Sequence, residues 1–148
     1  MDDIRITLTH PDLMPLRQRA GDAGADLKAA EWRVIQPGKS ALVSTGVSLA
    51  IPYGYAGFVF LRADMRCSAL VNDVHGTLLM NKFIVINHQD RRIVHLPIRN
   101  IGENPVDIRG GDILAQLVVL RIELPGFDVV KDLPQTARDA GGFGGTGV

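Results

Sequence analysis

The sequence predicts an all-β domain, and three observations carry that prediction. Apolar segments are short and rich in Val, Ile and Leu, and turn residues interrupt them about every 8–12 residues, the spacing of a β-sandwich or barrel. No segment sustains the 3.6-residue period of an amphipathic helix, and the best helical candidate, residues 68–74, spans barely two turns. The length of 148 residues fits one domain with a core of its own.

The predicted strands follow in chain order between turn signals such as Pro37-Gly38 and Gly110-Gly111-Asp112. Residues 41–51 alternate imperfectly, as a strand with a glycine bulge at Gly46 would. Residues 113–124 are almost all apolar, which predicts a strand covered on both faces and, in a domain of this size, burial against another subunit. The predicted strands are residues 4–9, 33–35, 41–51, 57–61, 78–86, 93–98, 106–108 and 113–124.

Composition excludes several classes of protein. Sixteen Lys and Arg balance 16 Asp and Glu, so a domain that holds nucleic acid by bulk positive charge is disfavoured, while a local cationic pocket stays open. No apolar run reaches the roughly 18–20 residues of a membrane span, and the start Met1-Asp2-Asp3 is unlike a signal peptide. Cys67 is the only cysteine, so we expect no intrachain disulfide and a reducing, cytoplasmic location.

The C-terminal tail has an unusual composition. Five of the 16 glycines lie in the last eight residues, together with Phe143, and Arg138 precedes them. Glycine lets backbone N–H groups approach an anion closely, arginine adds forked donors, and phenylalanine offers a flat face to a base or sugar. The alternative is a disordered terminus without a function. We therefore divide the chain into a β-domain, residues 1–136, and a flexible arm, residues 137–148.

Three internal segments place a polar residue among small or apolar ones. Residues 23–27, Ala-Gly-Ala-Asp-Leu, form a small-residue turn that presents Asp26, although an Asp that caps a loop is the alternative. Gln116 interrupts an apolar run and needs partners if it is buried, and neighbouring backbone groups could equally supply them. Arg62 and Arg66 follow a predicted strand, where a solvated loop with an Arg–Asp pair is the alternative.

In this order the segments resemble the trimeric deoxyuridine triphosphatase (dUTPase) family over residues 8–147. Residues 23–27 resemble the first motif of that family, and residues 46–59 resemble the usual lead into the second. Residues 100–117 resemble the stretch that ends in the fourth motif, and residues 138–147 resemble the fifth, the most specific of them.

The resemblance implies a distorted β-jelly roll that assembles as a homotrimer with three sites at subunit interfaces. It implies hydrolysis of dUTP to dUMP and pyrophosphate with Mg²⁺, in which Asp26 holds the hydrated metal and Phe143 covers the uracil. The residues that the resemblance places on the substrate are Arg62, Ser68, Gln116, Arg138, Phe143, Gly144, Gly145 and Thr146.

The second motif departs from the family pattern of Pro-Arg-Ser followed by a small residue. Residues 61–64, Leu-Arg-Ala-Asp, keep Arg62 but lose the phosphate-binding serine. A shifted register over residues 66–68 restores a hydroxyl at Ser68. The span to the third motif is also several residues longer than usual.

The third motif departs further. The family pattern is roughly Ile-Asp-x-x-Tyr-Arg-Gly-Glu, in which the Asp orients the attacking water and the Tyr packs under the deoxyribose. Residues 86–93 place Asn87 at the position of the base and Asp90 at that of the aromatic residue. An amide has no lone pair that accepts a proton near neutral pH, so Asn87 can orient water but cannot activate it. Asp73, His88 or Asp90 could supply a displaced base.

Three functions therefore remain open from the sequence. The first is a divergent dUTPase, or a relative acting on another deoxynucleotide triphosphate. The second is a catalytically impaired nucleotide-binding or regulatory protein on the same scaffold, favoured by Asn87. The third is a trimer that has lost nucleotides, against which the arm argues. A related deaminase branch needs a glutamate near the place of Ile93, so we rank deamination low.

Overall fold

Three antiparallel sheets make up the fold in the computed structural model, which describes residues 3–66, 78–80 and 82–138, with the backbone alone at 63–66. A single turn of 3-10 helix, η1 (Pro11–Leu13), precedes the second strand. Within these residues no helix is long and apolar enough to cross a membrane. The strands are β1 (Arg5–Leu8), β2 (Gly24–Lys28), β3 (Arg33–Ile35), β4 (Ser40–Ala50), β5 (Tyr55–Arg66), β6 (Leu78–Leu79), β7 (Ile84–Ile86), β8 (Ile93–Asn100), β9 (Val106–Ile108) and β10 (Ile113–Arg121).

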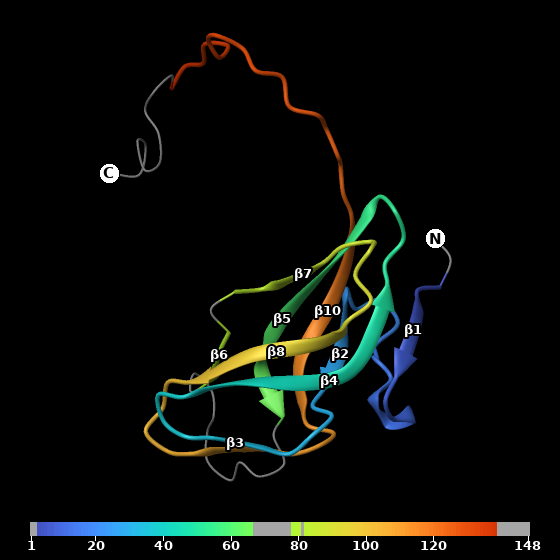
Figure 1. Ribbon diagram of the computed structural model, residues 1–148, viewed down its shortest axis with the longest axis vertical. Coiled ribbons are helices and arrows are strands. Elements are labelled where there is room, and N and C mark those ends of the chain that lie inside the picture. The colour runs from blue at the N-terminus through green and yellow to red at the C-terminus, as the bar shows by residue number, and fades with distance from the viewer. Residues whose placement is uncertain (1–2, 67–77, 81, 139–148) are drawn as a thin grey trace.

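Two four-stranded sheets enclose the core. One has the order β1-β4-β8-β6, the other has the order β2-β10-β5-β7, and β3 pairs with β9 in a small third sheet (Figure 1). Strand β8 alternates strictly between exposed and buried residues, as a strand with one face on a core should. Fully buried apolar side chains come from both large sheets, among them Val43, Leu96, Val59 and Leu27. The predicted all-β fold is therefore confirmed.

Most predicted strands are present with small changes of boundary. Residues 33–35 and 106–108 are strands with the predicted bounds, whereas the strand predicted at 57–61 extends over Tyr55–Arg66. Residues 78–86 form two short strands in different sheets instead of one, because β6 pairs with β8 and β7 pairs with β5. The short helix predicted at 68–74 lies outside the described residues.

The segment 23–27 corrects the sequence prediction of a turn. Residues Gly24–Lys28 form the edge strand β2, paired with β10. Small residues disfavour an isolated strand, but the buried ladder of β10 supplies the hydrogen bonds and the packing that override this local preference. Ala25 and Leu27 face the core, and the intervening Asp26 lies on the other face of the sheet.

The predicted glycine bulge of β4 is confirmed at Gly46. The pairing of β4 with β8 shifts its register between Ser44 and Ser48, and Gly46 has φ 67°. A Cβ at this position would lie 2.3 Å from Thr9 Oγ1 and 2.5 Å from Leu13 Cδ1. Glycine therefore allows both the left-handed backbone and the close approach of the segment that follows β1.

The chain leaves the sandwich after β10. The Ile122 N–H donates to the Gly54 carbonyl at 2.9 Å, and the following segment, 123–138, has no strand and runs away from the sheets (Figure 1). Several large apolar side chains of this segment face solvent, with Phe127 fully exposed and Leu133 83% exposed. The sandwich strands thus end at Arg121, and the boundary between a domain and an arm at residues 136–137 stays a prediction.

Candidate functional site

The site begins at Asp26, a carboxylate with only 3% of its surface exposed. Strand β2 places it opposite Gln116 of β10, at the edge of the second sheet. The loop between η1 and β2, residues 14–23, covers this edge and is called here the β2 loop. Its Leu16 forms an isolated antiparallel bridge with Asp26, in which the Asp26 N–H donates to the Leu16 carbonyl at 2.8 Å. The loop therefore excludes solvent from one side of the carboxylate.

Two donors share the Asp26 carboxylate. Arg62, from β5, forms an ion pair with Oδ1, and the Gln18 side-chain amide donates to Oδ2 at 2.6 Å. The Arg62 side chain is itself only 19% exposed. The register of β5 against β10 shifts between Ile113 and Ala115, so Arg62 lies at an irregularity of the strand pairing. Both oxygens of this buried carboxylate therefore have a partner, as burial of a polar group requires.

Gln116 lies over Gly24. A Cβ at Gly24 would be 2.2 Å from Gln116 Oε1, so only glycine leaves room for the amide in its present position. Among the described residues, no side chain forms a hydrogen bond with this amide. Gln116 lines the pocket next to Asp26, where its amide can donate to or accept from a ligand.

These side chains line a pocket of about 530 Å³. The sequence predicted that Asp26, Arg62 and Gln116 would meet, and the structure brings the three together. It missed the contribution of the β2 loop, because no motif or spacing marks a loop that folds back over a neighbouring strand. The pocket is lined by Gln18, Arg19, Asp22, Ala23, Gly24, Asp26, Arg62 and Gln116.

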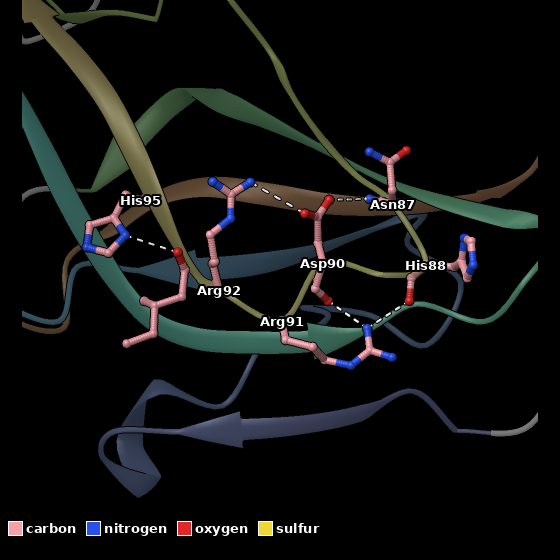
Figure 2. Close-up of polar contacts among 7 residues, drawn as sticks. Asn87, His88, Asp90, Arg91, Arg92 and His95 are labelled. Atoms are coloured by element: carbon pink, nitrogen blue, oxygen red, sulfur yellow. Dashed lines mark hydrogen bonds and ion pairs between the residues drawn. The ribbon is translucent and has the colours of Figure 1, made fainter.

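The turn between β7 and β8 holds Asn87 and Asp90. The Asn87 N–H donates to the Asp90 carboxylate at 2.8 Å, and Arg92 contacts the other carboxylate oxygen at 3.4 Å (Figure 2). The Arg91 guanidinium donates to the carbonyls of His88 and Asp90 at 2.8 and 2.7 Å. The polar groups of the turn are thus directed at one another (Figure 2).

The hydrogen bonds of Asp90 weaken it as a base. The Asn87 N–H holds the pKa of Asp90 below its ordinary value against a smaller opposing effect of burial, with lesser contributions from Arg92 and the Asn87 side chain. A general base works best with a pKa near the operating pH, so a lowered value is the wrong direction for activating water. The role of Asp90 as a substitute base stays a prediction, and this geometry disfavours it. The carboxylate instead closes the turn by accepting the Asn87 N–H.

The lowered pKa makes a pH-dependent prediction. Because the folded-state pKa is depressed, the carboxylate stabilises the turn at neutral pH, and this contribution is lost as the pH falls through the folded pKa. We expect the side-chain carboxyl ¹³C signal of Asp90 to titrate with a midpoint below 3.8, together with the Asn87 amide signal. In the Asp90→Asn control the Asn87 amide signal should not follow this titration. A midpoint at or above 3.8 would contradict the capping role.

The turn and the Asp26 pocket are separate within one chain. Asp90 and Arg92 line a different hollow, of about 660 Å³, with apolar residues of β4, β7 and β8, and none of its lining residues belongs to the Asp26 pocket. Arg138 lies exposed at the end of the described tail. Ser68, Phe143, Gly144, Gly145 and Thr146 lie outside the described residues.

The donors of the pocket fit a hydrated Mg²⁺ better than a directly ligated metal. No group of three or more His, Cys, Asp or Glu side chains comes together in the part of the chain that the structure describes. Asp26 and Asp22 are the two carboxylates of the pocket. Mg²⁺ keeps several waters and is usually held by one or two carboxylates together with substrate phosphates, so this pair suits its water shell.

Comparisons with known proteins place the chain. The dUTPase family model matches residues 12–147. Deoxyuridine 5′-triphosphate nucleotidohydrolase from Thermobifida fusca is 38% identical over 146 residues, covering 97% of this chain and 78% of that protein. The enzyme of the same name from Cutibacterium acnes is 36% identical over 143 residues, covering 96% of this chain and 90% of that protein.

Solved structures agree at the level of the fold. The dUTPase of Staphylococcus bacteriophage 80alpha, with dUPNHPP, superposes with a TM-score of 0.83 and 23% identity over the whole of both chains. A point mutant of the dUTPase from phage phi11, described with a structural Mg(II) ion, gives a TM-score of 0.73 at 23% identity, covering 88% of this chain and 98% of that one. Since the family model matches most of the sequence and the curated relatives match more than nine-tenths of it, the chain belongs to the dUTPase family.

Proposed function

We propose that this protein hydrolyses dUTP to dUMP and pyrophosphate, with Mg²⁺ as cofactor. The observation that carries the proposal is the pocket in which Asp26, Arg62 and Gln116 converge from three strands. Relatives named deoxyuridine 5′-triphosphate nucleotidohydrolase support dUTP as the substrate. If this protein instead acts on another deoxynucleotide triphosphate, that nucleotide would bind in the same pocket.

Each pocket residue has a chemical role in this proposal. The Gln116 amide donates to a phosphate oxygen, and Arg62 provides positive charge beside it. Asp26 accepts hydrogen bonds from the water shell of Mg²⁺, and the metal offsets the charge that develops on the phosphates. The pocket lining carries Arg19 and Arg62 against Asp22 and Asp26, so its own side chains sum to zero charge. Binding of a triphosphate therefore depends on the metal and on cations from elsewhere.

The missing parts of the site come from other copies of the chain in a homotrimer. Within one protomer the turn of Asn87 and Asp90 does not share the Asp26 pocket, and segment 123–138 runs away from the sandwich with exposed apolar side chains. A second protomer would supply the turn, and a third would supply the arm, residues 137–148. We assign Ser68 to phosphate binding beside Arg62, and the closing arm supplies Arg138, Phe143, Gly144, Gly145 and Thr146. The cytoplasm, which is reducing, suits a chain with Cys67 as its only cysteine.

A second candidate is a nucleotide-binding protein with little or no hydrolysis. Asn87 stands at the position of the family's catalytic base, and the carboxylate of Asp90 is already committed to Asn87 and Arg92. An amide can position a water molecule but cannot take its proton, so the chemical step would be slow while binding remained intact. Such a protein could act by sequestering or sensing a nucleotide.

One experiment separates the two candidates. The full-length protein is incubated with dUTP and Mg²⁺, and pyrophosphate release is measured beside calorimetric binding of dUPNHPP. Hydrolysis supports the first candidate, and binding without pyrophosphate release supports the second. A panel of the other deoxynucleotide triphosphates tests the choice of substrate. No release from any nucleotide and no binding would overturn both.

Gly24→Ala tests the role of Gln116 without a large change in stability. The added Cβ would displace the amide end of Gln116 and lie 3.2 Å from its Cβ, so the fold should tolerate it with a small shift, but the amide can no longer lie over β2. We expect dUPNHPP to bind about tenfold more weakly, the cost of one hydrogen bond to a charged group. Gly21→Ala is the matched control, because a Cβ there meets nothing within 4 Å. Equal affinity in the two variants would remove Gln116 from the site.

A further inference from the structure

Gln18 is the residue of the β2 loop that reaches Asp26. Its side-chain amide donates to Asp26 Oδ2 at 2.6 Å, while Arg62 takes Oδ1. The carboxylate is almost completely buried, so each of its hydrogen bonds counts for more than it would in water. No dUTPase motif in the sequence includes position 18, and the predicted site did not contain it.

The β2 loop presents Gln18 on a fixed backbone. The bridge between Leu16 and Asp26 sets the start of the loop against β2. Beyond Gln18, the Arg19 N–H donates to Asp22 Oδ2 at 3.0 Å, and Arg17 Nε donates to the Asp22 carbonyl at 3.0 Å. These contacts close the loop on both sides of Gln18, so its amide reaches the carboxylate from a defined direction.

The two donors of Asp26 differ in chemistry. Arg62 is a cation and could clamp both carboxylate oxygens in a forked pair, which would turn the carboxylate toward β5. Gln18 is neutral and occupies Oδ2, so it fixes the rotation of the carboxylate without cancelling its charge. Each carboxylate oxygen accepts more than one hydrogen bond, so Asp26 retains acceptor capacity for water molecules in the pocket.

We propose that Gln18 is a positioning residue that holds the Asp26 carboxylate in the orientation that accepts the water shell of a Mg²⁺–triphosphate complex. This inference rests on the proposed function of the pocket and adds a residue to it. Gln18 does not touch the phosphates in this proposal. It acts through Asp26, so its removal should weaken the metal-dependent part of nucleotide binding and leave the metal-independent part intact.

The test compares Gln18→Met with the wild type in calorimetric titrations of dUPNHPP, with Mg²⁺ and with EDTA in its place. Methionine keeps the length of the side chain and removes the donor. We expect the affinity with Mg²⁺ to fall about tenfold, in line with one hydrogen bond to a charged group, and the affinity in EDTA to stay unchanged. Gln36→Met, the same change on an exposed glutamine after β3, is the matched control and should match the wild type.

The outcomes distinguish this inference from the proposed function. A wild type that neither binds dUPNHPP nor hydrolyses dUTP overturns the proposed function, and the inference with it. A wild type that binds in a Mg²⁺-dependent way, with Gln18→Met indistinguishable from it, overturns the inference alone. An equal loss with Mg²⁺ and with EDTA also overturns it, because that result would place Gln18 on the nucleotide or in the fold.

Discussion

Asn87→Asp is expected to raise the rate of dUTP hydrolysis by about 100-fold to 10,000-fold, the usual contribution of a positioned general base. The main contact of the turn is the backbone bond from the Asn87 N–H to the Asp90 carboxylate, which the substitution keeps (Figure 2). A carboxylate at position 87 supplies the missing acceptor for the water proton. The measurement is the initial rate of pyrophosphate release with saturating dUTP and Mg²⁺.

The matched control is Asn104→Asp, the same substitution in an exposed turn between β8 and β9, which should leave the rate unchanged. Adding Asp90→Tyr to restore an aromatic wall would also remove the acceptor of the Asn87 N–H, so the single variant is the cleaner test. If the wild type is active and Asn87→Asp hydrolyses dUTP no faster, then another group activates the water and Asn87 is not at the reacting phosphate.

Arg62→Met is expected to destabilise the fold by about 3–5 kcal/mol, because it leaves the buried Asp26 carboxylate without its cation. Typical domains unfold with about 5–15 kcal/mol, so this variant should sit near the edge of stability. The measurement is the denaturant midpoint at fixed protein concentration, since assembly would add to the apparent stability.

Two further variants serve as controls for Arg62→Met. Arg109→Met breaks the exposed pair with Asp107, whose arginine side chain is 59% exposed, and should cost less than about 1 kcal/mol. The double variant Asp26→Asn with Arg62→Met removes both charges and should be more stable than Arg62→Met alone. If Arg62→Met loses no more stability than Arg109→Met, then breaking the Asp26–Arg62 pair does not leave an uncompensated buried charge.

Much of the fold could be predicted from the sequence, because a strand with one buried face alternates between apolar and polar residues. Strand β8 shows this directly, and β3 and β9 have the predicted bounds because turn residues flank short apolar runs. Strand β2 was missed because its small residues are typical of a turn. Its pairing with β10 comes from a part of the sequence far from β2, which local preference does not contain.

The candidate site was also only partly predictable from the sequence. Asp26, Arg62 and Gln116 were predicted from the order of motifs, and the structure brings them together in one pocket. Gln18 depends on how a loop returns over an edge strand, and no residue type or spacing in the loop encodes that path. The turn of Asn87 shows a further limit, since the sequence identifies the substitution but not that Asp90 is used to close the turn.

The β2 loop also governs how the second sheet ends. Strand β2 lies at the edge of that sheet, where unpaired backbone groups invite another chain to add a strand and start aggregation. The bridge between Leu16 and Asp26 occupies part of this edge. The same loop brings Gln18 to the carboxylate. Insertions or deletions in residues 14–23 would therefore alter colloidal solubility and the pocket together, which restricts how freely this loop can drift in evolution.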